Sequence, residues 1–416
     1  MPSTETFVVV GASLTGAKAA DTLRAEGFDG RVVLIGEEPQ RPYERPPLSK
    51  DYLRGEKGFD DAAVHPAGFY DEQGIELRTS TPVTGIDPAS REVIVSSGER
   101  LRYDRLLLAT GAAPRRLEVP GAELDGVHYL RSVADADALR GAITPSTEVL
   151  VVGAGWIGGE VAASARQLGA AAAMVELASA PLERVLGPEV GHIYADLHAE
   201  HGVDLHFGVG VDALVGSGAV EAVRLSDGTV LPAQVVVVGV GVAPRTELAE
   251  AAGIRIDNGI AVDEHLQTSA PGIYAAGDVA NAFHPRYGTP IRLEHWFAAL
   301  NQGPVAARNM LGQATSYERT PYFFSDQYDL GMEYRGWAPA FGQVAIRGEP
   351  ASGAFIAFWL RNGRVLAAMN ANVWDAGDAL EALLRSGRPV DSDRLADPDV
   401  DLSELVAGLL PEPGTA

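Results

Sequence analysis

The sequence predicts an α/β fold with two Rossmann-like dinucleotide-binding domains and a further α+β domain at its C-terminal end. The first observation is a strand, a glycine-containing turn, a helix and a second strand, in that order, over residues 7–37. The second is the return of this order about 140 residues later. The third is a change of pattern in the last part of the chain, where aromatic strands near residues 355–359 precede a helix over residues 375–385. Two βαβ units predict two nucleotide sites.

The composition bounds the class of protein. The chain has 416 residues, of which 46% are hydrophobic and 21% are charged, and this is typical of a soluble protein of two or three domains. A formal charge of −23 disfavours nucleic acids and anionic membrane surfaces as partners. The first strand-like run starts at Thr6, which leaves no room for an export signal, and no apolar run reaches the ~18 residues of a membrane helix. We therefore expect a cytoplasmic protein that is not embedded in a membrane.

The sequence contains no cysteine. A dithiol relay, a cysteine nucleophile and a thiolate-ligated iron–sulfur cluster are therefore excluded. No metal site is predicted either, so any redox chemistry requires a bound cofactor.

The first glycine turn runs from Gly11 to Gly16 and precedes a helix. Glycines at these positions suit a sharp bend and close helix packing, and the N–H groups at the start of the helix attract a pyrophosphate. Ser13 stands where the fingerprint usually has its second glycine, and it is small enough to be tolerated. Glu37 follows the second strand and is placed to accept hydrogen bonds from a ribose. The alternative is a tight turn with no nucleotide.

The second glycine turn matches the fingerprint fully, with Gly153, Gly155 and Gly158, and Glu176 closes its second strand. The Glu176 carboxylate suits a ribose 2′-hydroxyl, whereas a 2′-phosphate at ~4 Å would be repelled by about 4 kcal/mol before screening. We therefore predict NADH rather than NADPH. Arg184 could weaken this preference for NADH, because a nearby arginine can rescue 2′-phosphate binding. The alternative roles of Arg184 are an ion pair or a contact with the NAD pyrophosphate.

Further motifs follow one another along the whole chain. In order they are GxSxxG, RPPLSK, LATG, GAGWIGGE, GVGVAPRT, TSAPGIYAAGDVA, EHWFAALNQG and SDQYD. This order resembles the putidaredoxin reductase-like, oxygenase-coupled NADH–ferredoxin reductases, FAD-dependent members of the pyridine nucleotide-disulfide oxidoreductase superfamily. LATG and the Gly-Asp pair occur in many flavoproteins with two dinucleotide sites, whereas RPPLSK and SDQYD are narrower and identify the group. The resemblance extends from Phe7 to at least Trp374 and implies a glutathione-reductase-like fold.

The resemblance also implies a domain plan and a set of binding residues. An FAD-binding domain is formed by residues 1–113 and 245–320, an NAD-binding domain by residues 114–244, and a C-terminal domain involved in ferredoxin docking by residues 321–416. The positions that match the family's FAD contacts are Gly11, Ser13, Leu14, Thr15, Gly16, Glu37, Arg45, Lys50, Val83, Ala109, Thr110, Gly111, Arg131, Gly277, Asp278, His295 and Trp296. The positions that match its NAD contacts are Gly153, Gly155, Ile157, Gly158, Glu160, Glu176, Arg184 and Gly241. For Asp278 the implied role is a hydrogen bond to a ribityl hydroxyl, and the alternative is a helix cap.

Lys50 and Glu160 are the predicted catalytic residues. Lys50 occupies the region where the disulfide-reductase relatives carry their redox cysteines, and Glu160 matches the family's partner acid. A buried ammonium would stabilise the negative charge that the flavin gains on reduction, and the carboxylate would balance the ammonium in the oxidised state. The alternative is a solvated surface lysine.

The implied reaction moves a hydride from NADH to N5 of FAD and then single electrons to a [2Fe–2S] ferredoxin that serves a cytochrome P450 or a Rieske dioxygenase. An NADH oxidase or a disulfide reductase is disfavoured because those chemistries generally use an active-site cysteine. A mainly structural flavoprotein similar to apoptosis-inducing factor is the other alternative. We also hypothesise a basic docking patch of Arg308, Arg335 and Arg347, against the alternative of ordinary solvated or paired arginines. The sequence leaves monomer and homodimer open.

Overall fold

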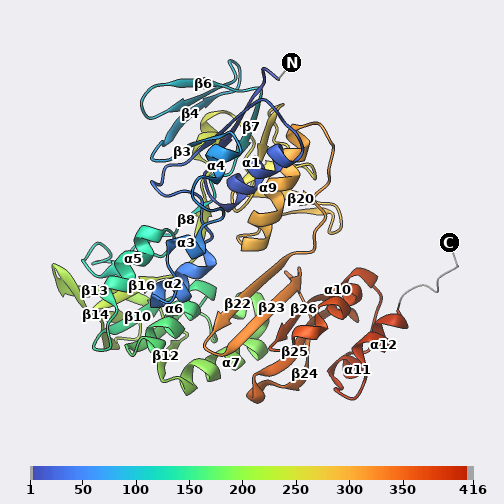
Figure 1. Ribbon diagram of the computed structural model, residues 1–416. Coiled ribbons are helices and arrows are strands. Elements are labelled where there is room, and N and C mark those ends of the chain that lie inside the picture. Colours follow the sequence, from blue (N-terminus) through green and yellow to red (C-terminus); the bar gives the residue numbers. More distant parts are fainter. Residues whose placement is uncertain (1–2, 410–416) are drawn as a thin grey trace. The chain divides into compact units, whose positions relative to one another are not determined.

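The computed structural model describes residues 3–409, and the chain divides into two compact units (Figure 1). Unit 1 comprises residues 1–47, 57–114 and 242–319, and unit 2 comprises residues 48–56, 115–241 and 320–416. Each unit is assembled from segments that are far apart in the sequence. The three-domain division expected from the resemblance stays a prediction.

Unit 1 is built on a five-stranded parallel sheet with the order β19-β7-β1-β2-β3. Its strands are β1 (Thr6–Val10), β2 (Arg31–Ile35), β3 (Ile75–Arg78), β7 (Arg105–Leu108) and β19 (Ile273–Ala275). The inner strands read as nearly continuous runs of valine, leucine and isoleucine, because a parallel sheet is covered on both faces. Helices α1 (Leu14–Ala25) and α9 (Trp296–Met310) lie side by side on the sheet. Glycine at position 303 permits this contact, because a Cβ there would lie only 2.4 Å from the Thr15 carbonyl oxygen.

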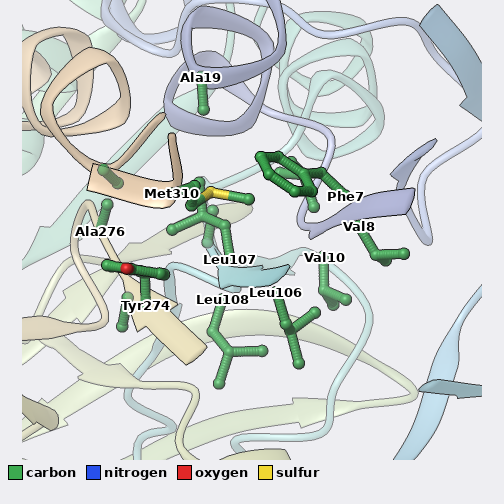
Figure 2. Close-up of a cluster of buried hydrophobic side chains, with 14 of the residues drawn as sticks. Phe7, Val8, Val10, Ala19, Leu106, Leu107, Leu108, Tyr274, Ala276 and Met310 are labelled. Atoms are coloured by element: carbon green, nitrogen blue, oxygen red, sulfur yellow. The ribbon is translucent and has the colours of Figure 1, made fainter. Parts of the chain in front are cut away.

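The core of unit 1 joins this sheet to its helices (Figure 2). Phe7 stacks on Phe28 with ring centroids 4.1 Å apart, and Leu107 is fully buried at the centre of β7. Met310 of α9 is buried in the same cluster, and the Tyr274 hydroxyl donates to the Asn309 carbonyl oxygen at 3.0 Å. The strand ends that carry the first glycine turn are therefore held by a packed core.

The rest of unit 1 consists of short elements. Its other strands are β4 (Val83–Asp87), β5 (Glu92–Val95), β6 (Arg100–Arg102), β8 (Ala112–Pro114), β17 (Val242–Pro244), β18 (Ile260–Val262), β20 (Ala280–His284) and β21 (Thr289–Ile291). Its other helices are α3 (Phe59–Ala62), α4 (Phe69–Glu72) and α8 (Glu247–Ala251). Strands β4, β5 and β6 form an antiparallel sheet.

Unit 2 contains a second five-stranded parallel sheet, with the order β12-β11-β10-β16-β9. Its strands are β9 (Val127–His128), β10 (Glu148–Val152), β11 (Ala171–Glu176), β12 (Val203–Phe207) and β16 (Val235–Val238). Its helices are α2 (Asp51–Arg54), α5 (Val133–Ala142), α6 (Trp156–Gln167) and α7 (Glu183–Glu200), and an antiparallel sheet is formed by β13 (Val211–Ser217), β14 (Ala219–Leu225) and β15 (Val230–Pro232). The sequence did not predict α7, because Gly187 and Pro188 are typical of helix ends; the backbone kinks at Gly187, with φ +80°, and the helix resumes.

The C-terminal part of unit 2 is an antiparallel sheet with the order β22-β23-β26-β25-β24. The strands are β22 (Tyr322–Gln327), β23 (Leu330–Gly336), β24 (Gln343–Glu349), β25 (Ala354–Arg361) and β26 (Arg364–Ala371), followed by helices α10 (Gly377–Ser386), α11 (Ser392–Ala396) and α12 (Leu402–Ala407). Trp359 of β25 is fully buried, and its indole N–H donates to the Leu186 carbonyl oxygen at 2.8 Å. Two Rossmann-like sheets and an α+β C-terminal region confirm the predicted fold class.

Across residues 3–409, no helix combines the length and the apolar character that crossing a membrane requires.

Candidate functional site

The first group of predicted site residues lies at one edge of the unit 1 sheet. Strands β1, β2, β7 and β19 are parallel neighbours, so their carboxyl ends meet at the same edge. Gly11, Glu37, Thr110 and Gly277 follow these four strands. The predicted residues beside them in sequence are Ala109, Gly111 and Asp278. The structure thus gathers the expected FAD residues of four strands at the place where open parallel sheets bind ligands.

The first glycine turn is closed by contacts that allow no side chain. Gly11 has φ +116°, and a Cβ there would lie 2.0 Å from the Ala109 carbonyl oxygen. A Cβ at Gly16 would lie 2.1 Å from the Gly11 carbonyl oxygen, so glycine is what lets α1 begin directly against the turn. Within the described residues, Ser13 at the N-cap of α1 makes no side-chain capping hydrogen bond. The first turn of this helix therefore suits an anionic group such as a pyrophosphate.

Glu37 is engaged by an arginine that the sequence reasoning did not single out. Arg245 donates to both carboxylate oxygens of Glu37, and this contact lowers the pKa of Glu37. Arg245 lies in the GVGVAPRT motif, so the motif was visible although the role was not. Each carboxylate oxygen can accept more than one hydrogen bond, so Glu37 keeps the capacity to accept from a ribose hydroxyl.

The remaining predicted residues of unit 1 lie at the start of α9, in the loop that contains Arg45, and at the start of β4. His295 is the N-cap of α9 and Trp296 its first residue, and burial lowers the pKa of His295 to about 4. The Arg45 guanidinium lies 3.2 Å from a Glu38 carboxylate oxygen, and Val83 opens strand β4. An arginine, a neutral imidazole and an indole are groups that suit a large aromatic and anionic cofactor.

The second glycine turn, in unit 2, has the same construction. Gly153 has φ +97°, and a Cβ there would lie 2.5 Å from the Gly239 carbonyl oxygen. A Cβ at Gly158 would lie 2.0 Å from the Gly153 carbonyl oxygen. In the part of the chain that the structure describes, a Cβ at Gly155 would meet no atom within 4 Å, and Gly155 as N-cap of α6 provides no side-chain cap. The space over the start of α6 is therefore open to a phosphate group.

Glu176 ends β11 and folds back toward the second turn. Its two carboxylate oxygens accept from the backbone N–H groups of Ala154 at 2.8 Å and Ala178 at 3.0 Å. Gly241 follows β16, the strand next to β10 on the other side, and therefore lies at the same edge of the sheet. Arg184 is exposed in the first turn of α7. Glu176 is thus fixed beside the glycine turn, with its remaining acceptor capacity available to a ribose.

Lys50 and Glu160 form a buried ion pair within unit 2. Lys50 Nζ lies 3.3 Å from Glu160 Oε1, and the two residues are 8% and 6% exposed. Two hydroxyl groups also reach the carboxylate: Ser49 Oγ lies 2.5 Å from Oε2 and Ser325 Oγ lies 2.8 Å from Oε1. Ser49 is anchored in turn, because Ser164 of α6 donates to its carbonyl oxygen at 2.7 Å. Sequence reasoning missed both serines as partners, although they lie in the RPPLSK and SDQYD motifs.

The alternative of a solvated surface lysine is wrong, because Lys50 is buried. An ammonium at this depth needs a counter-charge, and the Glu160 carboxylate supplies it. The Lys50 ammonium also lies 5.2 Å from the centre of the Phe324 ring. Arg131, another predicted FAD residue, lies in unit 2 at the start of α5, where its backbone N–H donates to Asp135 Oδ2 at 3.1 Å. The roles of Lys50 and Arg131 toward a flavin stay predictions.

The three arginines of the hypothesised basic docking patch each have contacts within their own unit. Arg308 is ion-paired with Glu26 at 2.8 Å within unit 1. Arg335 is ion-paired with Glu333 at 2.8 Å, and Arg347 donates to backbone carbonyl oxygens of residues 397–400. Arg308 and Arg335 thus match the alternative of paired arginines, and the docking patch stays a prediction.

The chain is similar to known proteins over nearly its whole length. The family model described as pyridine nucleotide-disulphide oxidoreductase matches residues 5–303, and the model described as reductase C-terminal matches residues 322–406. The anthranilate 1,2-dioxygenase system ferredoxin–NAD(+) reductase component of Burkholderia cepacia is 41% identical over 97% of this chain and 100% of its own length. Putidaredoxin reductase of Pseudomonas putida is 36% identical over 100% of both chains. The solved structure of the covalent putidaredoxin reductase–putidaredoxin complex has a TM-score of 0.93 at 36% identity, and it covers 97% of this chain and 99% of that one.

Proposed function

This chain belongs to the pyridine nucleotide-disulphide oxidoreductase family, and from that premise we propose that it is an FAD-containing NADH:ferredoxin reductase. The protein oxidises NADH and delivers single electrons to a [2Fe–2S] ferredoxin that serves a cytochrome P450 or a dioxygenase. Full-length similarity to the anthranilate dioxygenase reductase component and to putidaredoxin reductase supports this proposal.

One observation carries the proposal: a chain with two dinucleotide-binding turns contains no cysteine. A disulfide reductase of this family would pass electrons through a pair of thiols, and this chain has none to use. Its electrons must therefore leave directly from the cofactor to an external acceptor. An NADH oxidase or disulfide reductase is disfavoured for the same reason.

The residues at each turn fit the groups they would hold. The start of α1 would receive the pyrophosphate of FAD and the start of α6 that of NADH, with Glu37 and Glu176 accepting from the two riboses. Bound FAD would couple a two-electron donor to a one-electron acceptor. The Lys50 ammonium offsets negative charge in the buried site, and the Glu160 carboxylate holds the ammonium in position.

The other predictions about the chain belong to the same proposal. We propose residues 1–113 and 245–320 as the FAD-binding domain, residues 114–244 as the NAD-binding domain and residues 321–416 as the C-terminal domain. The match of the reductase C-terminal model to residues 322–406 supports the last of these boundaries. We also propose that the protein works in the cytoplasm, where NADH is available.

The proposal is tested by rapid mixing of the FAD-loaded protein with NADH. We expect NADH to bleach the flavin absorbance rapidly. Turnover with oxygen as the only acceptor should be slow, and addition of a ferredoxin with cytochrome c should make it fast. Flavin that NADH does not bleach would contradict the proposal. Rapid bleaching with fast oxygen consumption and no ferredoxin dependence would favour an oxidase instead.

A further inference from the structure

A row of hydrogen-bonded side chains leads from Glu160 into the C-terminal sheet of unit 2. Ser325 Oγ lies 2.8 Å from Glu160 Oε1, and Gln327 Nε2 lies 3.4 Å from Ser325 Oγ. His198 Nε2 lies 2.9 Å from Gln327 Oε1, and His198 Nδ1 lies 3.3 Å from the Tyr328 hydroxyl. Ser325, Gln327 and His198 are each 1% exposed. Side chains with this degree of burial need their hydrogen bonds, because water cannot replace them.

The direction of each hydrogen bond in the row follows from its neighbours. A carboxylate only accepts, so the Ser325 hydroxyl donates to Glu160 and accepts from the Gln327 amide N–H. The Gln327 amide oxygen then accepts from His198 Nε2–H. Burial lowers the pKa of His198 to about 4, so the ring is neutral at pH 7 and its Nδ1 accepts from the Tyr328 hydroxyl. Every donor in the row points toward Glu160, and the final donor stabilises its charge.

Strand periodicity brings two members of the row to the same face. Residues two apart on a strand share a face, so Ser325 and Gln327 of β22 both lie on the buried face while Asp326 between them is exposed. Helix α6, which carries Glu160, contacts β22. The SDQYD motif, which served in the sequence only to identify the family, thus supplies three groups of the row: Ser325, Gln327 and Tyr328.

Gly159 shows how tightly Gln327 is held against α6. A Cβ at Gly159 would lie 2.7 Å from Gln327 Oε1 and 3.0 Å from both Cδ and Nε2. Gly159 is not one of the three fingerprint glycines, and the interior of a helix disfavours glycine relative to alanine. The Gln327 amide fills the space that a side chain at Gly159 would take.

We propose that Ser325, Gln327 and His198 are positioning residues that hold the Glu160 carboxylate toward Lys50. Through them, the C-terminal strand β22 sets the geometry of the Lys50–Glu160 pair. The inference rests on the proposed function for its catalytic consequence, because the pair matters for the rate only if NADH reduces a flavin. The geometric part stands on the hydrogen-bond row alone.

The first test uses Ser325→Ala and Gln327→Met in the FAD-loaded protein. We expect each to slow flavin bleaching at saturating NADH by about tenfold, with the half-saturating NADH concentration unchanged, because a misplaced charge affects the reaction and not the binding. In a Glu160→Gln background, Ser325→Ala should slow bleaching no further, since it acts through that carboxylate. An unchanged rate in both folded variants, or independent losses that multiply in the double variant, would overturn the proposal.

The second test first displaces a member of the row without removing its polar group, and then changes His198. Gly159→Ala should displace the Gln327 amide and reproduce the rate of Gln327→Met. Gly141→Ala is the matched control, because Gly141 lies in helix α5 and its Cβ would meet nothing within 4 Å in the described part of the chain. His198→Gln, which keeps an N–H donor, should retain most of the rate, whereas His198→Leu should lose it. Equal rates for Gly159→Ala and Gly141→Ala would contradict the proposed contact.

A third measurement separates this inference from the proposed function. The urea midpoints of Ser325→Ala, Glu160→Gln and the double variant form a cycle that needs no NADH. We expect the midpoint shifts to be clearly non-additive, with the double variant little worse than Glu160→Gln. Additive midpoint shifts would refute the positioning role of Ser325, even if the protein is a reductase. If the midpoint shifts are non-additive but NADH does not bleach the flavin, the positioning role of the row stands and the reductase function is refuted.

Discussion

The two glycine turns share one backbone design but have different charged surroundings. A Cβ at Gly16 would lie 2.1 Å from the preceding glycine's carbonyl oxygen, and one at Gly158 would lie 2.0 Å from its equivalent. The helices that follow have 12 residues each. Two residues past the third glycine, however, unit 1 has Lys18 and unit 2 has Glu160. The shared part is the backbone arrangement that we propose binds a dinucleotide, and the difference falls at Glu160, which we propose takes part in the chemistry.

The two charged residues differ in depth and in partner. Lys18 pairs at 3.0 Å with Asp21, three residues along the same helix, and their side chains are 27% and 30% exposed. The Lys50 and Glu160 side chains are 10% and 7% exposed and come from segments far apart in the sequence. A pair on one helix face is a small local gain, whereas a buried pair fixes two segments to each other.

The largest expected effect comes from removing the charge of Glu160, compared with removing that of Lys18. Glu160→Ala should lower the free energy of unfolding by about 3–5 kcal/mol, because it leaves the buried Lys50 ammonium without its carboxylate. Lys18→Ala should cost about 0.5 kcal/mol or less, the usual value for a pair on one helix. Urea unfolding of both variants provides the measurement. Similar losses in the two variants would contradict the distinction between the turns.

Alanine at the third glycine of each turn should have the next largest effect. Gly16→Ala and Gly158→Ala each place a methyl group against a backbone oxygen, which should cost about 1–3 kcal/mol. Gly16→Ala should lower the amount of FAD retained per protein, measured by absorbance. Gly158→Ala should keep its FAD and need more NADH for half-maximal bleaching. Loss of the same ligand in both variants would show that the assignment of turns to ligands is wrong.

Replacing the glutamate at the second strand of each βαβ unit, Glu37 or Glu176, should have a smaller effect. This effect concerns the choice between NADH and NADPH. Glu176→Gln keeps an acceptor for the Ala154 N–H but removes the charge that repels a 2′-phosphate. We expect the preference for NADH over NADPH, measured as the ratio of kcat/KM values, to narrow by about tenfold. Glu37→Gln is the control and should leave this ratio unchanged. An equal change in both variants would place the NADH ribose elsewhere.

The smallest expected effect concerns the ion pair of Glu37 with Arg245; within residues 3–409, Glu176 has no such ion pair. The side chains of Arg245 and Glu37 are 41% and 46% exposed, so Arg245→Ala should cost less than about 1 kcal/mol at pH 7. The pKa of Glu37 is lowered in the folded protein by its hydrogen bond to Arg245. Such a group stabilises the fold above its ordinary value of 4.5 and loses this contribution as the pH falls through its lowered pKa. The difference between wild type and variant in urea unfolding should therefore disappear in acid; a difference that grows in acid would contradict this sign.

Local patterns in the sequence were sufficient to predict the fold class. Valine-rich strands, glycine turns and helix periodicity depend on neighbours within a few residues, so the two parallel sheets and the C-terminal helix α10 were predictable. Helix α7 was missed because Gly187 and Pro188 are typical of helix ends, and only the kinked packing observed here allows both within one helix. The role of Arg245 was missed for a related reason, since its partner Glu37 is 208 residues away.

By itself, the sequence determined that the chain has two glycine turns of the dinucleotide-binding type and no cysteine, and its resemblance to a known family pointed to Lys50 and Glu160. Only the tertiary structure decided what surrounds that pair. Ser49, the β22 pair of Ser325 and Gln327, and His198 come from three segments that are far apart in the sequence. Their hydrogen bonds exist only because these segments and α6 pack together in unit 2. A buried carboxylate takes its partners from whatever the fold brings within about 3 Å, and sequence spacing carries little information about that distance.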